Sequence, residues 1–288
     1  MCGRYAVTTD PARLAAEIDA RNEVSDPDTA ERLAEGNYNV APTSTVMTVV
    51  QRHDHGQRDS GQRDSGQRDR SGSRDDSGSR DDSGSRDDSG SRDSSAEADE
   101  ATRRVRAMRW GLVPPWTKEL GKGPLLFNAR AETVGSKPAF RSSLKGKRCL
   151  VPMDGWYEWK PGPEGANGKP TKVPYFMSPD DGSRLFMAGL WAAWRPTAAR
   201  EAGDDSAWVS STTIITTDAV GSLTDIHHRM PLIMPHENWD AWLDPDAPPD
   251  PALLAPPAAE LVERIGIREV APLVNRVANN GPELLEPV

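Results

Sequence analysis

Short apolar runs rich in Val, Ile, Thr and Trp recur along most of the chain, and Gly and Pro separate them. Runs of about four to eight such residues between turn-forming residues are typical of β-strands. The pattern predicts strands at Cys2–Val7, Val46–Gln51, Arg103–Gly111, Arg148–Pro152, Tyr157–Lys160, Val173–Met177, Leu185–Trp191, Ser210–Thr216, Leu232–Met234 and Ile267–Val270.

Helix signals are fewer and irregularly placed. Asp10 followed by Pro11 predicts an N-cap and a first helical residue, with the helix running to about Ala20. Further short helices are expected at Pro138–Leu144, His236–Leu243 and, interrupted by prolines, Ala252–Glu260. The sequence lacks the regular strand–helix alternation and the glycine-rich fingerprint of a dinucleotide-binding sheet. We therefore expect an α+β fold built on a mainly antiparallel, partly barrel-like sheet.

One low-complexity stretch interrupts this pattern. Residues 56–94 repeat Gly-Gln-Arg-Asp-Ser and then Ser-Gly-Ser-Arg-Asp-Asp, and they hold no core-forming side chains. Such a segment is expected to be disordered. Its apolar flanks, Val46–Val50 and Val105–Val113, are predicted to be the strands of a hairpin with an expanded turn, since closure entropy grows slowly with loop length. The chain is thus expected to form a single domain over 1–288, interrupted at about 52–101.

The net charge of −9 gives no indication of nucleic-acid binding, which usually shows as a basic excess, although a local basic cleft stays open. Nearly every Arg of the repeat precedes an Asp, so a solvated insertion is favoured over a nucleic-acid tether. Two cysteines are too few for a disulfide scaffold. Because the sequence shows neither a signal peptide nor an apolar stretch of about 18 residues, we expect a cytoplasmic protein.

Cys2 is the first candidate for chemistry. It follows Met1, and aminopeptidases remove an initiator methionine that precedes a small side chain. The mature chain would then begin with an α-amine and a thiol on adjacent carbons. Such a group can use the amine as a base for the thiol, or condense with an aldehyde through both groups. An ordinary buried cysteine is the alternative.

Two further polar residues stand in apolar or aromatic settings. Asn128 ends the apolar run Leu125–Phe127, so its amide needs hydrogen-bond partners; capping of a following turn is the alternative. Glu158 stands between Tyr157 and Trp159 on a predicted strand. Burial there would raise its pKa and suit proton transfer near neutral pH. Alternatively, strand alternation turns Glu158 to water.

His227 and His228 form the last candidate group. Histidine is the natural proton shuttle near neutral pH. Adjacent histidines on an extended segment point opposite ways, so we expect only one to face a site. A zinc site is disfavoured because neither a Cys pair nor a third well-spaced ligand accompanies the histidines.

Taken together, these motifs resemble the SOS response-associated peptidase (SRAP) domain family, also called abasic-site processing proteins. The resemblance covers the chain apart from the insertion, which is far longer than the usual loop. Its markers are Met1-Cys2-Gly3-Arg4-Tyr5, Asn39-Val40-Ala41-Pro42, Trp110-Gly111-Leu112-Val113-Pro114-Pro115-Trp116, residues 128–133, residues 155–159, Ile226-His227-His228-Arg229-Met230-Pro231 and the ending Asn275–Pro287.

The resemblance implies a DNA-damage-response enzyme that recognises an abasic site in single-stranded DNA and crosslinks to its aldehyde through mature Cys2. An α-amine has a pKa of about 7.7–8.0, so a substantial fraction of it is neutral at cellular pH, where lysine, near 10.4, is charged. It can form an imine, on which the thiol closes a thiazolidine. The resemblance also implies a monomer without metal or cofactor, associated with the nucleoid when bound to DNA, and carrying lyase- or peptidase-type activity.

Site roles also follow from the resemblance. Asn128 should hold the Cys2 amine or the sugar, Glu158 should move protons, and His227 should act near the sugar oxygen or the 3′ phosphate. The expected DNA contacts are Arg4, Arg130 and Arg229 on phosphates, with Trp116 and Pro42 stacking on bases.

Two other functions stay open. An N-terminal-cysteine hydrolase would use the α-amine as base and the thiol as nucleophile on an amide. A non-catalytic single-stranded-DNA-binding module would leave Cys2 dispensable.

Overall fold

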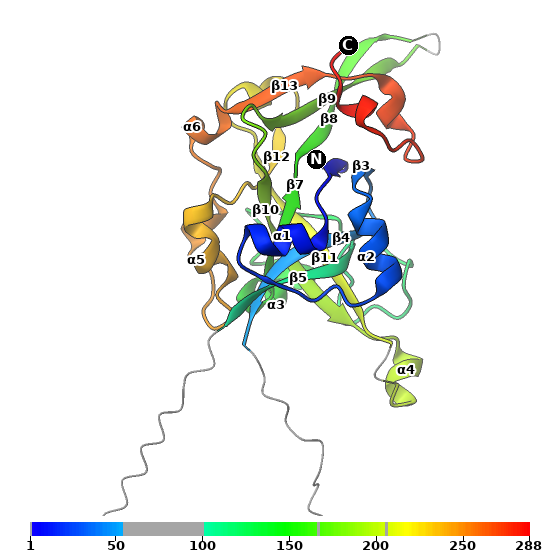
Figure 1. Ribbon diagram of the computed structural model, residues 1–288, viewed down its shortest axis with the longest axis vertical. Helices are drawn as coiled ribbons and strands as arrows, with labels where there is room; N and C mark the ends of the chain where they lie inside the picture. Colours follow the sequence, from blue (N-terminus) through cyan, green and yellow to red (C-terminus); the bar gives the residue numbers. More distant parts are fainter. Residues whose placement is uncertain (1, 54–100, 166–167, 205–206) are drawn as a thin grey trace, which may run out of the picture. The chain divides into compact units, whose positions relative to one another are not determined.

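The computed structural model describes residues 2–53, 101–165, 168–204 and 207–288 (Figure 1). Residues 1–52 and 101–288 form one compact unit. The expected disordered insertion at about 52–101 falls almost wholly on residues 54–100 and lies outside the described residues.

The larger sheet has the strand order β12-β11-β10-β7-β4-β5-β2, with β6 beside β11. Its strands are β2 (Arg21–Asn22), β4 (Thr45–Arg52), β5 (Thr102–Trp110), β6 (Asn128–Arg130), β7 (Arg148–Met153), β10 (Leu185–Trp194), β11 (Val209–Asp218) and β12 (Arg229–Pro231). Most neighbours are antiparallel, but β11 pairs in parallel with β5 and β6, and β2 with β5. The β11–β5 pairing connects the sheet back to itself, so it is partly ring-like without being a barrel.

The second sheet has the order β13-β9-β8-β1-β3 and is antiparallel throughout. Its strands are β1 (Tyr5–Val7), β3 (Asn37–Val40), β8 (Gly155–Glu164), β9 (Pro170–Pro179) and β13 (Ile265–Glu269). The expected α+β fold with a mainly antiparallel sheet is therefore confirmed.

The predicted hairpin around the insertion is also confirmed. Strands β4 and β5 pair in antiparallel register from Thr45 opposite Arg109 to Arg52 opposite Thr102. The chain therefore leaves and re-enters the sheet at adjacent positions.

The first helix begins at the predicted capping residue. In α1 (Pro11–Glu17), Asp10 accepts hydrogen bonds from the backbone N–H groups of Ala12 and Arg13. The other α-helices are α2 (Pro27–Ala34), α3 (Pro138–Gly146), α4 (Thr197–Glu201), α5 (Trp239–Leu243) and α6 (Ala259–Val262). The 3-10 helices are η1 (Gly221–Asp225), η2 (His236–Asn238), η3 (Pro251–Leu254), η4 (Pro272–Asn275) and η5 (Pro282–Leu285). No helix in the described part of the chain is long and apolar enough to cross a bilayer.

Prolines interrupt the helical segment near 252–260, as expected: Pro256 and Pro257 separate η3 from α6. Other elements differ from the sequence expectations. The strand expected at Leu232–Met234 lies instead at β12, where Thr216 of β11 pairs with Pro231. Helices α2 and α4 and strands β2, β3 and β6 were not predicted. Helix α2 repeats the Asp-Pro signal of α1, with Asp26 as its N-cap.

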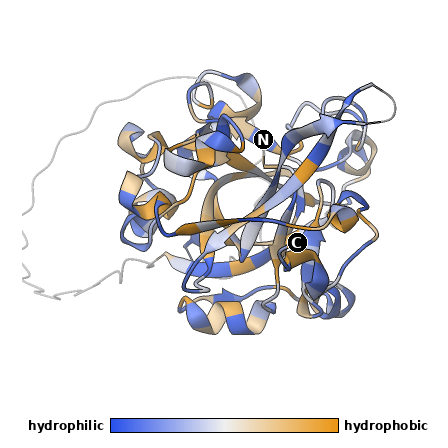
Figure 2. Ribbon diagram, turned by 90° about the horizontal axis from the view of Figure 1, so that it is seen from above, coloured by the Kyte–Doolittle hydropathy of each residue, from blue (hydrophilic) through white to orange (hydrophobic). Residues whose placement is uncertain are grey.

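Side chains of the two sheets pack together in the core beside the N-terminal strand β1. The fully buried Trp110 of β5 contacts Tyr5 of β1 edge-to-face at 5.2 Å between centroids, and Phe127 at 6.0 Å. Its indole N–H donates to the Phe127 carbonyl oxygen at 2.9 Å, which satisfies the buried polar group. Peripheral helices in Figure 2 alternate hydrophobic and hydrophilic residues, as expected for helices with one face on a core.

Candidate functional site

Cys2 is completely buried, just before β1. Strand β1 pairs with β8 through Tyr5 opposite Trp156, and the Tyr157 N–H donates to the Arg4 carbonyl oxygen at 2.9 Å. The antiparallel pairing therefore carries the N-terminal segment along the strand that holds Glu158.

Asn128 contacts Cys2 directly. Its Nδ2 donates to the Cys2 carbonyl oxygen at 2.7 Å. Within the described residues, its buried Oδ1 has no hydrogen-bond partner. Asn128 begins strand β6 and pairs in register with Ile214 of β11, so the alternative in which it caps a turn is wrong. A buried amide oxygen of this kind is suited to accept from an amine.

Glu158 lies inside the protein. It is 5% exposed, so the alternative in which strand alternation turns it to water is wrong. Burial raises the pKa of Glu158. Burial also raises the pKa of the Cys2 thiol strongly, and the nearby Glu158 charge raises it further. The thiol is therefore protonated at neutral pH and needs a base before it can react as a nucleophile.

His227 is half-buried in the turn between η1 and β12. The Arg229 backbone N–H donates to its Nδ1 at 2.9 Å. Burial lowers the pKa of His227, and the positive charges of the chain's amino terminus and of His228 lower it further. The imidazole is thus favoured in its neutral form. The expectation that the two histidines point opposite ways is wrong: their rings stack at 4.3 Å with 24° between planes, because the segment turns instead of extending.

The four predicted catalytic residues therefore share one region. Asn128 comes from β6, Glu158 from β8 and His227 from the segment before β12, and the amino-terminal charge acts on both ionisable groups. The region offers an amide, a carboxyl group of raised pKa and a neutral imidazole around a buried thiol. This set can exchange protons at neutral pH.

Arg4 is fixed by a buried residue whose role the sequence did not reveal. Arg4 Nη1 donates to Asn39 Oδ1 at 2.6 Å and to the Val274 carbonyl oxygen at 2.9 Å. Asn39, only 2% exposed, donates through Nδ2 to the carbonyl oxygens of Arg276 at 3.0 Å and Asn279 at 2.9 Å. Asn39 thereby ties the C-terminal segment to Arg4. The position of Asn39 in the motif Asn39-Val40-Ala41-Pro42 was the sequence signal that could have pointed to this role.

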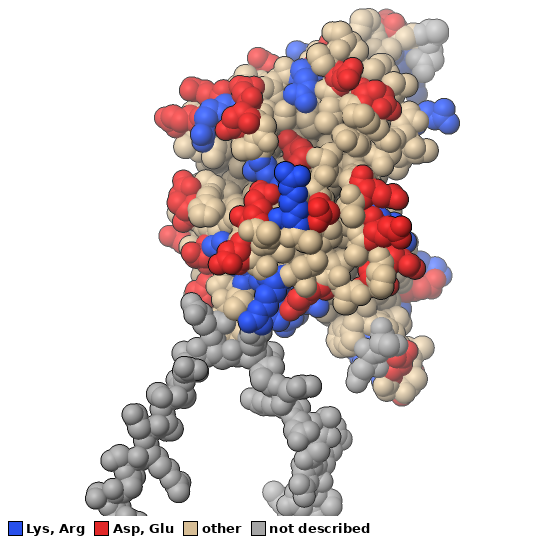
Figure 3. All heavy atoms as spheres, in the orientation of Figure 1, with Lys and Arg blue, Asp and Glu red and all other residues tan. Residues whose placement is uncertain are grey.

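The other two predicted phosphate ligands differ in their surroundings. Arg130 is exposed at the end of β6. Arg229 is only 6% exposed, and its guanidinium contacts the carboxylates of Glu132 and Asp218. A phosphate contact of Arg229 stays a prediction, and it would have to compete with these carboxylates. Figure 3 shows Asp and Glu interspersed with Lys and Arg over the visible face, consistent with the net charge of −9.

The predicted base-stacking residues lie at an exposed apolar surface. Trp116 is 58% exposed and Pro42 is half-buried. Thr43, the residue after Pro42, lines one hollow together with residues of the segment 111–126, to which Trp116 belongs. Leu125 of the same segment is 44% exposed. This surface has the apolar character that base stacking requires.

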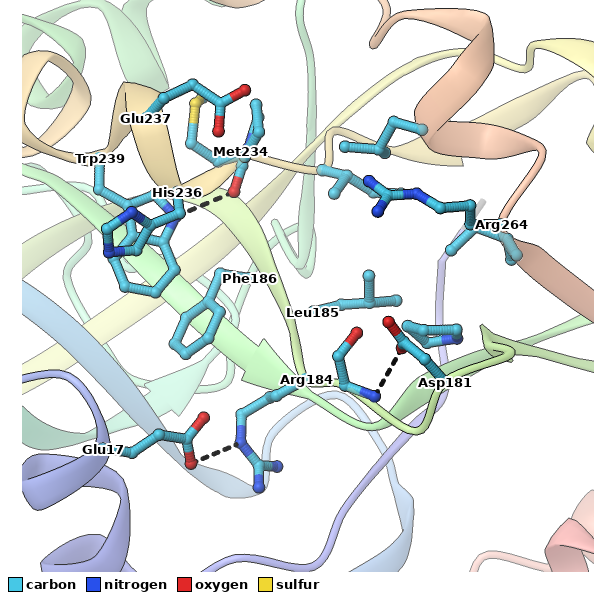
Figure 4. A pocket seen from close by; sticks show the side chains of 16 residues that line it. Glu17, Asp181, Arg184, Leu185, Phe186, Met234, His236, Glu237, Trp239 and Arg264 are labelled. Atoms are coloured by element: carbon cyan, nitrogen blue, oxygen red, sulfur yellow. Dashed lines mark hydrogen bonds and ion pairs between the residues drawn. The ribbon is translucent and has the colours of Figure 1, made fainter.

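A separate cavity of about 420 Å³ lies between β10, η2 and β13 (Figure 4). His236, Trp239 and Phe186 gather on one side of it, and Arg184 turns toward Glu17, with 3.5 Å between Nε and the carboxylate. None of the predicted site residues lines it. Within the described residues, no group of three or more His, Cys, Asp and Glu side chains is placed to hold a metal ion.

Comparison with known proteins decides the family. The sequence model described as "SOS response associated peptidase (SRAP)" matches residues 1–277. The chain belongs to the SRAP family. "Abasic site processing protein YoqW" of Bacillus subtilis (strain 168) is 38% identical over 189 residues, covering 65% of this chain and 78% of its own. "Abasic site processing protein HMCES" of Pongo abelii is 35% identical over 218 residues, covering 65% of this chain and 57% of its own.

A solved structure shares the SRAP fold of this chain. A protein from Bacteroides thetaiotaomicron superposes with a TM-score of 0.64 at 22% identity, covering 100% of both chains. A second, from Bordetella bronchiseptica, has a TM-score of 0.58 at 23% identity, covering 94% of this chain and 100% of its own. These likenesses show the fold alone.

Proposed function

We propose that this protein processes abasic sites in single-stranded DNA by bonding covalently to them through mature Cys2. The observation that carries the proposal is the convergence of Asn128, Glu158 and His227 on the N-terminal segment. Matched SRAP relatives named as abasic site processing proteins support the choice of substrate.

The reaction uses both groups of the N-terminal cysteine. After removal of Met1, the α-amine attacks the aldehyde carbon of the ring-opened sugar, and the resulting carbinolamine loses water to give an imine. The thiol sulfur then bonds to the imine carbon, and the thiol proton goes to the nitrogen. Aldehyde and aminothiol thus become a thiazolidine and one water. Ring closure is intramolecular and gains from proximity.

Each site residue has a step that suits its environment. Asn128 Oδ1 accepts a hydrogen bond from the α-amine and orients it. Glu158, with its raised pKa, passes a proton to the departing hydroxyl as the imine forms and then relays the thiol proton to the nitrogen as sulfur attacks. His227, neutral in its half-buried position, donates a hydrogen bond to the sugar oxygen during ring opening.

DNA binding rests on the arginines and on the exposed apolar segment. Arg130 is exposed, and Arg4 is held ready by Asn39. Trp116 is exposed enough to stack on a base, a contact worth about 1–3 kcal/mol. Because phosphate binding releases counterions, affinity should fall steeply with salt concentration.

Intact-mass spectrometry tests the proposal. The purified protein should lack Met1 and should gain the mass of an abasic single-stranded oligonucleotide, less one water, in a form that survives denaturation. Cys2→Ser should give an imine that persists only after borohydride reduction, because serine closes the ring poorly. Cys2→Ala should give no thiazolidine, and an equally stable adduct from this variant would overturn the mechanism.

Two alternatives predict different outcomes. An N-terminal-cysteine hydrolase would turn over amides without an adduct, but burial raises the pKa of the Cys2 thiol and so disfavours a free thiolate. A non-covalent binding module would protect abasic DNA equally well as Cys2→Ala. Glutaminase or peptidase turnover in place of an adduct would favour the first alternative, and intact protection by Cys2→Ala would favour the second.

A further inference from the structure

A group of basic side chains lies at the open end of the β4–β5 hairpin. Arg52 ends β4, and Arg104 and Arg106 belong to β5. Val50 is paired opposite Arg104, and Thr48 opposite Arg106. Because successive strand residues point to opposite faces and paired residues point to the same face, the three arginines share one face of the sheet. Arg104 Nη2 also donates to the Arg52 carbonyl oxygen at 3.3 Å, which holds the two residues together.

Trp191 of β10 holds two cations on this face. The Arg52 guanidinium carbon lies 5.1 Å from the centroid of the Trp191 ring, and Lys147 Nζ lies 5.4 Å from it. Trp191 packs in one buried cluster with Val50 and Met108, which point the same way as the arginines. The ring is only 6% exposed, so it supports the cations and offers little surface on which a base could stack.

The group carries more positive than negative charge. Glu23 pairs with Arg104 at 2.6 Å and with Arg106 at 3.4 Å. The side chains of Arg52 and Lys147 form no hydrogen bond or ion pair with any described residue. Burial lowers the pKa of Arg52, and the positive charges of Arg106 and Arg104 lower it further. The fold therefore holds like charges together at a cost, in a chain whose net charge is −9.

A phosphate backbone is the ligand that suits this group, the distal basic site, which consists of Arg52, Arg104, Arg106 and Lys147. A solvated surface is the ordinary explanation for basic side chains on a sheet. It fits the exposed lysine, but the three arginines are half-buried and clustered. Guanidinium groups pair with phosphate at two points, and the covered indole ring disfavours base stacking. Such a site binds a nucleic-acid strand of any sequence.

The distal basic site lies away from Cys2. Strand β5 runs from this site to Trp110, which packs on Tyr5 beside the N-terminal segment. From Arg104 to Trp110 the strand spans about 20 Å, at a rise of about 3.4 Å per residue. In Figure 1, β4 and β5 run away from the N-terminus toward this end. A DNA strand held at Cys2 therefore reaches the distal basic site only if it extends several nucleotides beyond the lesion.

We propose that the distal basic site is a second DNA contact, at which the cations bind phosphates of the single strand well beyond the lesion. Its role is to raise the affinity for long strands without acting on the chemistry at Cys2. That the bound strand is the one bonded at Cys2 rests on the proposed function, whereas the binding of phosphates does not.

Lesion-free DNA tests the phosphate contact without the crosslinking reaction. Arg52→Gln/Lys147→Gln removes the two cations that pair with no described carboxylate. The matched control, Arg13→Gln/Lys172→Gln, removes the same charge from exposed positions on α1 and β9.

Fluorescence anisotropy with a single strand of about 30 nucleotides should show about 10-fold lower affinity for Arg52→Gln/Lys147→Gln. The slope of log affinity against log salt concentration should be smaller by about 1.4, since each neutralised phosphate contributes about 0.7. The control should stay within about 2-fold of wild type. Equal losses in the two double variants would show a non-specific effect of net charge and overturn the proposal.

Crosslinking to abasic strands of two lengths tests where the contact lies. With a strand of about 30 nucleotides and a central lesion, Arg52→Gln/Lys147→Gln should raise the half-saturating DNA concentration about 10-fold and leave the saturated rate unchanged. A strand of about 5 nucleotides is too short to reach the distal basic site, so both quantities should match the wild type. A lower saturated rate, or an equal loss with the short strand, would place the effect at Cys2 and overturn the proposal.

Urea unfolding checks that the double variants fold. If Arg52→Gln/Lys147→Gln did not fold, the two single variants would replace it, each with a salt slope smaller by about 0.7. An unchanged slope in both would overturn the proposal. If the wild type formed no adduct, the proposed function would fail while the anisotropy measurement still decided the phosphate contact.

Discussion

At the residue scale, the burial of Glu158 suits the proposed reaction but lowers the stability of the folded protein. A carboxyl group that is 5% exposed suffers desolvation when it ionises, and this raises its pKa. The raised pKa also makes the Glu158 carboxylate a stronger base than an exposed one, which suits it to proton transfer. We therefore expect its removal to help the fold and to harm the reaction.

Glu158→Gln should be more stable than the wild type at pH 7–8 and much slower in crosslinking. Because the folded-state pKa is raised, the cost of burying the charge is present above the unfolded pKa of about 4.3 and disappears below it. The difference in unfolding free energy should therefore shrink toward zero near pH 4. Urea titrations from pH 4 to 8 measure it, with the exposed Glu119→Gln as control. Lower stability of Glu158→Gln at pH 7.5 would contradict this account.

Asn128 offers a second test at the same scale. Asn128→Ala removes the donor to the Cys2 carbonyl oxygen and the buried Oδ1 that we assign to the amine. Crosslinking should slow by at least about 10-fold, while the unfolding free energy changes by about 1 kcal/mol, the usual net value of one hydrogen bond. Asn22→Ala, which removes a local turn contact to Val24, is the control. An unchanged rate in Asn128→Ala would remove Asn128 from the mechanism.

At the element scale, β8 is the strand on which the site depends. It pairs with β1 on one side and β9 on the other, and it carries Glu158 past the N-terminal segment. Gly155 at its start packs so closely that an added Cβ would lie 2.4 Å from both the Met177 carbonyl oxygen and Phe176 Cζ. The contact requires a residue without a side chain.

Gly155→Ala should therefore destabilise the protein by about 1–3 kcal/mol, the usual cost of overpacking, and should slow crosslinking as β8 shifts. Urea unfolding and adduct formation measure the two effects. Gly135→Ala is the matched control, because its added Cβ would meet only Leu144 Cδ2 at 3.8 Å. Equal stability of the two variants would show that β8 can move without cost.

At the scale of the whole molecule, the β4–β5 hairpin separates the fold from the insertion. Arg52 and Thr102 are paired across its open end. Residues 53–101 have a composition that cannot form a core, so the folded unit should not need them.

Replacing residues 53–101 with a four-residue turn should raise the unfolding free energy by about 2 kcal/mol, since each halving of loop length lowers the closure cost by about 0.6 kcal/mol. Crosslinking should stay within about 2-fold of wild type. A Gly/Ser segment of the original length is the control and should leave stability unchanged. Loss of folding or of activity in both variants would show that the insertion contributes to the domain.

The sequence alone determined much of the fold and the identities of the central residues. Short apolar runs bounded by Gly and Pro predicted most long strands, and the Asp10-Pro11 signal predicted the first helix, because those signals are local. Short elements without such a pattern, such as β6, were missed, since only their pairing with β11 makes them strands. Cys2, Asn128, Glu158 and His227 were found because their residue types and motifs carry the chemistry.

Only the tertiary structure decided which groups contact which. Asn128 meets Cys2 across 126 residues of sequence, and Arg229 meets Glu132 across 97. The burial of Glu158, the stacking of His227 on His228 and the enclosure of Arg229 between carboxylates likewise depend on strand register and on elements remote in sequence. The type of a residue determines which reactions its side chain can take part in. Its pKa and its hydrogen-bond partners are set by neighbours that only folding brings together.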